Sequence, residues 1–187
     1  MADGDPIRAI MAAVHALDTC GIAYFIGGSV ASGIYGLYRA TADVDIVARI
    51  AQEDVERLSS SLDERFYADV EMMREAITTR SSFNILDVQT GYKIDVFIDA
   101  GDRYASSQFE RRARTKVSSA GDAVYVASAE DMILAKLRWF DAGNRVSERH
   151  WSDVIGMLRV QGGNLDYAYL QRWARSLGIA ALLTAAQ

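Results

Sequence analysis

Cysteine, histidine and proline are all scarce in this chain. Its 187 residues include one cysteine, Cys20, one proline, Pro6, and two histidines, His15 and His150. A single cysteine excludes an internal disulfide and is typical of a reducing compartment, so we expect a cytoplasmic protein. Three Cys and His side chains in total are also too few for an ordinary zinc site.

Long apolar runs and a strong positive charge are missing as well. No stretch approaches the roughly 20 apolar residues that a membrane helix needs, and the first residues do not resemble a signal peptide, so we expect no membrane association. The net charge of −5 argues against broad nucleic-acid binding. The basic run FERRARTK, residues 109–116, could form a local patch, although a solvated helix face is the commoner reading.

The pattern of hydrophobic residues predicts an α+β fold. Half of the residues are hydrophobic and 24% are charged, which is typical of a globular protein with a real core. Short alternating segments predict a small β-sheet in the first two thirds, and helical periodicity follows from Ser128 onward. We expect a core over residues 1–127 and a C-terminal helical cap over 128–187, packed together because no linker-like composition separates them.

Two of the expected strands carry aspartates on one face. Asp43 and Asp45 alternate with aliphatic residues in DVDIVARI, and Asp95 has the same relation to its neighbours in YKIDVFI. If the strands are neighbours, all three carboxylates project from one side of the sheet. Such a cluster needs cations, and its hard oxygen ligands suit Mg²⁺ or Mn²⁺. Two ions about 4 Å apart can align an attacking oxygen with a phosphorus.

Neither aspartate motif is decisive alone. An isolated D-x-D is more often a solvated strand face. Asp87 is a rival third carboxylate, although it shares its face with Phe83 and Ile85 and lies nearer a turn.

A glycine turn precedes the aspartates. Gly27 and Gly28 let the backbone approach a ligand closely, and Ser29 offers a hydroxyl at the start of a helix, where free N–H groups favour a phosphate. The turn is not a Walker loop, because Ile34 and Tyr35 stand where lysine and serine would be needed.

In this order, the motifs resemble those of the nucleotidyltransferase superfamily typified by DNA polymerase β. They are G-G-S, thirteen residues, D-V-D, and a later K-I-D-V-F, and the resemblance covers roughly residues 20 to 100. The resemblance implies a small mixed sheet with helices on one side. It also implies that Gly28 and Ser29 hold the β,γ-phosphates of an NTP. Asp43 and Asp45 would bind both metal ions, and Asp95 would join them and help to activate the incoming hydroxyl.

The C-terminal part resembles, more loosely, bacterial nucleotidyltransferases of abortive-infection and toxin–antitoxin systems. There a lysine and a later aspartate complete the site, and the matching positions are Lys136 and Asp153. Lys136 falls within the apolar arc of its helix, which is costly unless its ammonium reaches water or an anion such as a triphosphate. We therefore expect Lys136→Met to bind NTP more weakly at unchanged or higher stability.

Two further residues are accessory candidates. Asp153 lies away from the apolar stripe of its own helix and could instead pair with Arg149 on the surface. Arg39 could order the loop before the first aspartate.

Two functions fit these patterns. The first is a Mg²⁺-dependent enzyme that transfers NMP from an NTP to a hydroxyl of a tRNA, a protein or a small molecule such as an aminoglycoside. The alternative is a non-catalytic binding module, the partner of another protein in a toxin–antitoxin or similar assembly. Three mutually repelling carboxylates favour the enzyme, because an idle site has no reason to keep them.

Overall fold

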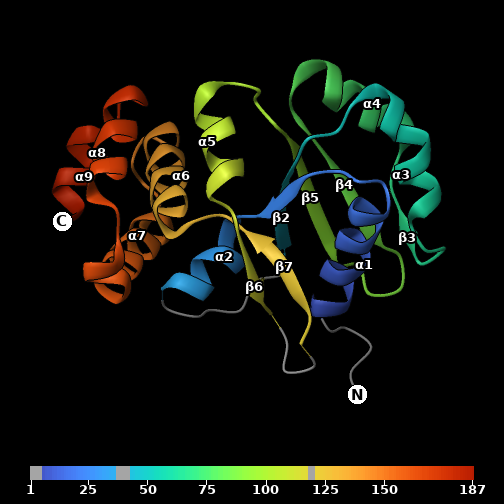
Figure 1. Cartoon of the computed structure of the whole chain (residues 1–187), viewed down its shortest axis with the longest axis horizontal. Helices are drawn as coiled ribbons and strands as arrows, with labels where there is room; N and C mark the ends of the chain where they lie inside the picture. Colours follow the sequence, from blue (N-terminus) through green and yellow to red (C-terminus); the bar gives the residue numbers. More distant parts are fainter. Residues whose placement is uncertain (1–5, 37–42, 118–120) are drawn as a thin grey trace.

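The computed structural model of the chain describes residues 6–36, 43–117 and 121–187 (Figure 1). A seven-stranded sheet in the order β3-β4-β5-β2-β1-β7-β6 forms its centre. The strands are β1 (Tyr24–Ile26), β2 (Asp43–Ala48), β3 (Phe66–Tyr67), β4 (Ser82–Asp87), β5 (Lys93–Ile98), β6 (Ala113–Lys116) and β7 (Ala123–Val126). β2 pairs with β5, and β1 with β7, in parallel, whereas the other neighbours are antiparallel. The predicted small mixed sheet is therefore confirmed.

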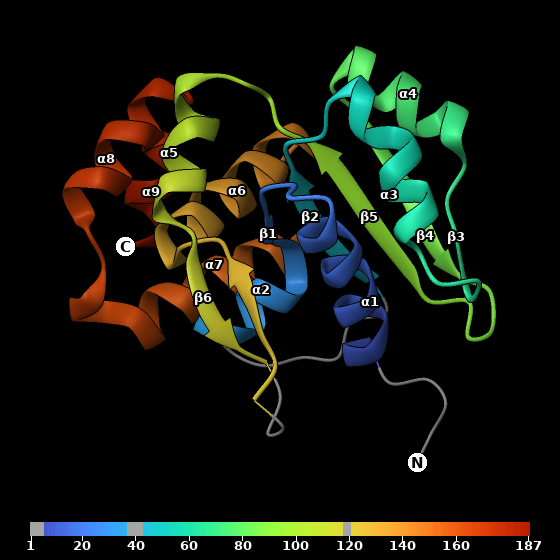
Figure 2. The same ribbon diagram turned by 45° about the vertical axis from the view of Figure 1, so that its right-hand side comes forward.

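Most of the helices gather in two groups on this sheet, and α2 and α5 belong to neither group. They are α1 (Pro6–Thr19), α2 (Gly28–Tyr35), α3 (Val55–Ser61), α4 (Val70–Thr79), α5 (Arg103–Arg111), α6 (Ala129–Ala142), α7 (Glu148–Gln161), α8 (Tyr167–Ser176) and α9 (Ala180–Ala186). Short 3₁₀ turns cover Gln52–Asp54 and Gly162–Asn164. Helices α1, α3 and α4 lie together beside β4 and β5, and α6 to α9 lie together at the opposite end (Figures 1 and 2). This arrangement has the α+β class expected from the sequence.

Alternation along β2 and β5 decides which face is buried. The inward rows are Val44, Ile46 and Ala48 on β2 and Ile94 and Val96 on β5, all fully buried. Because side chains alternate across a strand, the acidic residues between them must point to the other face. The hydrophobic pattern thus places polar chemistry on one face of the sheet and the core on the other.

The C-terminal helices pack onto the sheet portion through α6. Helix α6 begins at Ser128, whose hydroxyl accepts the Asp131 N–H, and it contacts α2 as well as α7, α8 and α9. Leu134 and Leu137 are fully buried in the same hydrophobic cluster as the strands. The division into a core over 1–127 and a cap over 128–187 stays a prediction. Among the described residues, no helix is long and apolar enough to cross a membrane.

The basic run FERRARTK is not one helix face. Arg111 ends α5, and a bend at Arg112 leads into β6, which carries Arg114 and Lys116. Arg111 Nη2 pairs with Glu130 Oε2 at 3.0 Å. The interpretation of the run as one helix face was wrong. The run contains too few hydrophobic residues to mark where α5 ends and where the edge strand β6 begins.

Candidate active site

Three carboxylates meet on the outward face of β2 and β5. In the parallel register, Asp45 lies directly beside Asp95, and Asp43 is one alternation away on the same face. We call Asp43, Asp45 and Asp95 the carboxylate block. The sequence predicted that these side chains share a face, and the pairing of β2 with β5 brings them together.

Gly28 allows the turn before α2 to lie against this block. Its φ of +57° favours glycine, and a Cβ added there would stand 1.6 Å from Asp45 Oδ2. The preceding residue, Gly27, donates its N–H to the Asp45 carbonyl at 2.8 Å and caps α2 without a side chain. The N-terminus of α2 therefore lies next to Asp45, where its positive end favours anions.

The pKa of Asp45 is affected by the charged groups around it. Burial raises the pKa of this carboxyl, and the charges of Asp95 and Asp43 raise it further, whereas Lys136 and Lys93 act in the opposite direction. Like charges this close disfavour the ionised form, so the block gains from any added cation.

One cation near the block comes from β5 itself. Lys93 lies beside Asp43 in the strand register, and its Nζ is 2.9 Å from Asp95 Oδ1. This hydrogen bond with Asp95 raises the pKa of Lys93. The sequence placed Lys93 on the face of Asp95 but gave it no role.

A second basic residue reaches the glycine turn from α7. Arg149 Nη2 donates to Ser29 Oγ at 3.2 Å, and Ser29 is nearly buried at the start of α2. The sequence indicates Arg149 only as a surface partner of Asp153. That pairing was wrong, because Arg149 turns toward Ser29.

Lys136 and Asp153 form an ion pair between α6 and α7. Lys136 Nζ lies 2.9 Å from Asp153 Oδ2, and the two side chains are only 6% and 11% exposed. The ammonium thus meets an anion, as the apolar arc of α6 required, but within the protein. It also lines the same cleft as Asp43 and Asp45, and its charge lowers the pKa of Asp45.

A cleft of about 460 Å³ lies between the sheet face and helices α5, α6 and α7. The charged residues that line it are Asp43, Asp45, Asp99, Asp131, Lys136 and Arg149, beside the glycine turn of Gly27, Gly28 and Ser29. Its apolar portion includes Phe25, Val47, Phe97 and Met132. Trp139, 58% exposed, also lines the cleft. The volume lies within the usual range for small-molecule pockets of about 300–1,000 Å³.

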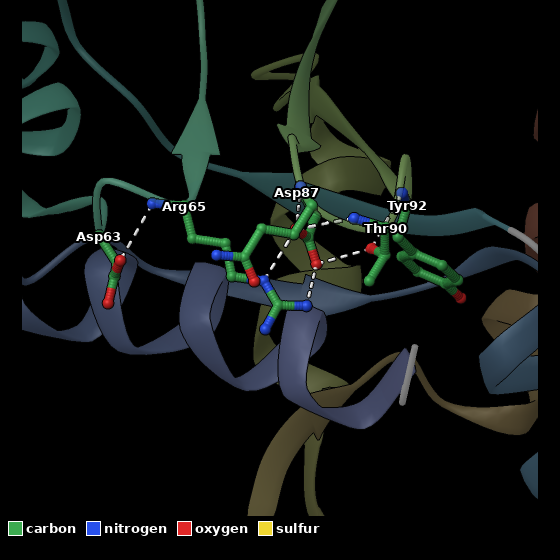
Figure 3. A network of polar contacts seen from close by, with 6 residues as sticks. Asp63, Arg65, Asp87, Thr90 and Tyr92 are labelled. Atoms are coloured by element: carbon green, nitrogen blue, oxygen red, sulfur yellow. Dashed lines mark hydrogen bonds and ion pairs between the residues drawn. The ribbon is translucent and has the colours of Figure 1, made fainter. Parts of the chain in front are cut away.

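The rival carboxylate, Asp87, belongs to a separate network at the far end of β4 (Figure 3). Arg65 Nε donates to Asp87 Oδ1 at 2.8 Å, Arg65 Nη2 also pairs with this carboxylate, and Thr90 Oγ1 donates to Asp87 Oδ2 at 2.7 Å. The N–H of Gln89 donates as well, at 3.0 Å. The Arg65 guanidinium, ahead of these other hydrogen bonds, holds the pKa of Asp87 well below its usual value. Asp87 therefore joins β3 to the β4–β5 hairpin.

The donor chemistry of the block fits a divalent cation, although the side chains are not converged around one. Within the described ranges, no three or more His, Cys, Asp or Glu side chains are grouped as metal ligands. Asp43 and Asp45 offer hard carboxylate oxygens on one strand face, while Asp95 is turned to Lys93. The metal roles of the three aspartates stay predictions, and Arg39 lies outside the described residues.

Solved structures of nucleotidyltransferases share this fold. The crystal structure of ANT(2″)-Ia in complex with adenylyl-2″-tobramycin aligns with 91% of this chain and 97% of its own, at a TM-score of 0.58 and 15% identity. Lincomycin-bound LnuA, a lincosamide antibiotic adenylyltransferase, aligns over 82% and 96% of the two chains, at a TM-score of 0.53 and 14% identity.

A third similar structure is an antigenic nucleotidyltransferase-like protein from Paracoccidioides brasiliensis, with a TM-score of 0.50 and 19% identity over 91% of this chain and 90% of that one. No protein-family model and no curated protein sequence matches the chain. The chain has the fold of these nucleotidyltransferases, the fold that its motifs indicated. The looser likeness of its C-terminal part to toxin–antitoxin proteins stays a prediction.

Proposed function

We propose that this chain transfers a nucleoside monophosphate from an NTP to a hydroxyl acceptor and releases pyrophosphate. The observation that carries the proposal is the carboxylate block beside the N-terminus of α2, with basic side chains facing it from the helical part. Asp43 and Asp45, which would hold cations, and Lys136 and Arg149, which would hold phosphates, line one cleft, and Asp95 lies beside Asp45 at its edge.

The two portions of the cleft match the two portions of a nucleotide. The phosphates would lie against Ser29 and the first-turn amides of α2, where Lys136 and Arg149 add positive charge. The nucleoside would occupy the apolar portion. Because adenylyltransferases are among the similar folds, ATP is the first nucleotide to test.

The chemistry follows from the placement of the carboxylates. A new bond would join the acceptor oxygen to the α-phosphorus, and the bond from that phosphorus to the bridging oxygen would break, so that pyrophosphate leaves. Two Mg²⁺ or Mn²⁺ ions, when held by the block, would supply positive charge for the attacking and leaving oxygens. Asp95, at the edge of the block away from α2, would accept the proton of the hydroxyl.

For the acceptor, we propose a small molecule. ANT(2″)-Ia is known with an adenylylated aminoglycoside, and LnuA with lincomycin. The net charge of −5 also disfavours broad contact with RNA phosphates. Transfer to tRNA or to a partner protein of a toxin–antitoxin pair remains an outcome of the same experiment.

The position of the label in the nucleotide tests the reaction. The protein is incubated with Mg²⁺ and ATP labelled at either the α- or the γ-phosphate, together with tobramycin, lincomycin, total RNA or a protein extract. We expect transfer of the α-label alone, and its loss in an Asp43→Asn/Asp45→Asn variant. The three other NTPs are tested in the same way.

The same experiment separates the competing functions. Transfer of the γ-label would indicate a phosphotransferase. Mg²⁺-dependent stabilisation by ATP without any transfer would favour the binding module. If no nucleotide is bound or transferred with any acceptor class, the proposed function is wrong.

A further inference from the structure

Lysine is rare in this chain, and its position relative to the carboxylate block is unusual. The sequence has three lysines, Lys93, Lys116 and Lys136, against 17 arginines among its 20 basic residues. Two of these three lysines act on the charge of Asp45. Lys136 approaches from α6, but Lys93 belongs to the same strand as Asp95.

The backbone fixes Lys93 in the block. Paired positions on β2 and β5 form a square on the outward face of the sheet: Asp43 beside Lys93, and Asp45 beside Asp95. Side chains directly opposite on neighbouring strands lie about 5 Å apart at Cβ. Three corners of the square are therefore acidic, and the fourth is a lysine.

The contacts show how this lysine is used. Lys93 Nζ lies 2.9 Å from Asp95 Oδ1, so the third carboxylate already has a positive partner. The Asp95 side chain is 17% exposed, whereas that of Lys93 is 46% exposed and its long stem can swing into solvent. By contrast, Lys136 is held at 6% exposure by Asp153.

We propose that Lys93 is a resident cation of the carboxylate block, so that the nucleotide-free protein binds one divalent ion tightly, at Asp43 and Asp45. The ammonium keeps Asp95 out of the ligand set. A second ion can use Asp95 as a ligand only after the Lys93 ammonium swings away. The negative charge of a bound triphosphate favours this exchange, because it attracts the second ion to the block. This inference rests on the proposed function, and it makes the two-ion state depend on nucleotide.

Counting bound Mn²⁺ tests the inference without measuring activity. Metal-free protein is titrated with Mn²⁺, and the free ion is followed by electron paramagnetic resonance. For the unmodified protein we expect one tight ion per chain. The second ion should bind at least about tenfold more weakly than the first, because a full positive charge lies within a few ångströms of its site. Lys93→Met keeps the stem without the charge and should bind two ions with similar affinity.

Matched variants control for the loss of a lysine. Lys93→Arg keeps the charge and should behave like the unmodified protein, as should Lys116→Met, which changes the exposed lysine of β6. Lys93→Gln repeats the loss of charge with a polar side chain, and thermal melting checks that every variant is folded.

Several results would overturn the proposal. They are equal stoichiometry and affinity in the unmodified protein and Lys93→Met, two tight ions in the unmodified protein, or no Mn²⁺ binding by either. The proposed function is judged separately by transfer of the α-label. A protein that transfers the label but shows no effect of Lys93→Met on Mn²⁺ binding keeps its function and loses this inference.

Discussion

Two acidic sites on one sheet differ in the donors around them. Asp87, 1% exposed, is surrounded by an arginine, a hydroxyl and backbone N–H groups, and its pKa is lowered. Asp45, also partly buried, has two other carboxylates as its neighbours, and its pKa is raised. Burial of a carboxylate therefore does not identify a functional site. Its neighbours do: the three carboxylates outnumber the two lysines that act on Asp45, so the block still gains from an external cation.

The largest expected effect is on the reaction. Asp45→Asn should reduce NMP transfer about a hundredfold to a thousandfold, the loss typical when one stabilising group is removed from an active site. Folding should be unchanged or slightly favoured, because the substitution removes a repulsion. Initial rates of α-label transfer and the melting temperature measure both effects, with the exposed Asp18→Asn on α1 as control. If Asp45→Asn unfolds instead, Asp45 has a structural role like that of Asp87, and the two sites do not differ in function.

The reverse pattern is expected at the second site. Asp87→Asn should lower the free energy of unfolding by about 3 kcal/mol, because it leaves the largely buried Arg65 without its carboxylate. Transfer by the folded fraction should be unaffected. Urea unfolding at a temperature where both proteins are folded gives the value. A loss below about 0.5 kcal/mol, the size of an ordinary surface substitution, would contradict the structural role.

The next effect concerns nucleotide binding. Lys136→Met should weaken NTP binding by about 1.5–3 kcal/mol, the scale of a charged hydrogen bond. The sequence led us to expect unchanged or higher stability, but the ion pair with Asp153 reverses that expectation, because the variant leaves a buried carboxylate without its ammonium. Calorimetric titration with Mg²⁺ and ATP, together with melting curves, tests both parts.

Asp153→Asn is the matched control for this variant. It keeps the Lys136 charge but removes its internal partner, so nucleotide affinity should be retained or increased. Weaker binding in both variants would instead mean that the ion pair acts by holding α6 against α7.

The smallest effect is the pH dependence of stability. Asp87 has a lowered pKa, so its contribution is complete above the unfolded value of about 3.9 and is lost only as the pH falls through the lower folded value. Asp45 has a raised pKa, so its ionised form costs stability at neutral pH, and that cost disappears as the pH falls through the raised value. Unfolding free energies between about pH 7 and pH 4 should therefore show the Asp45→Asn advantage shrinking while the Asp87→Asn loss persists.

The sequence predicted the structure best where hydrophobic residues recur with a regular period. Alternation in β2 and β5 predicted which face bears Asp43, Asp45 and Asp95, and the helical period predicted α1 and the helices after Ser128. Strand order is not encoded in either period. That Asp45 lies directly beside Asp95 became clear only from the parallel pairing of β2 and β5.

The missed features all depend on contacts between elements. Asp153 lies off the apolar stripe of its own helix, but α6 crosses that side and supplies Lys136. The role of Arg149 depends on where α7 begins relative to Ser29. Strand β6 escaped prediction because polar residues dominate it and it shows no period of two. Helix α5 does have a helical period, with Tyr104, Ala105 and Phe109 buried on one side, but most of its other residues are polar, so the period is easily overlooked.

The position of Trp139 gives the cleft a built-in optical reporter. The other two tryptophans lie in aromatic surroundings: Trp151 packs on Phe140, and Trp173 lies beside Tyr104 and Tyr169. Trp139 is largely exposed to water and lines the cleft, so its emission lies at longer wavelength than that of an indole packed among side chains. Excitation at the red edge of the absorption band avoids the tyrosines, and the long-wavelength part of the tryptophan emission then reports whatever enters the cleft, without a label on the protein or on the ligand.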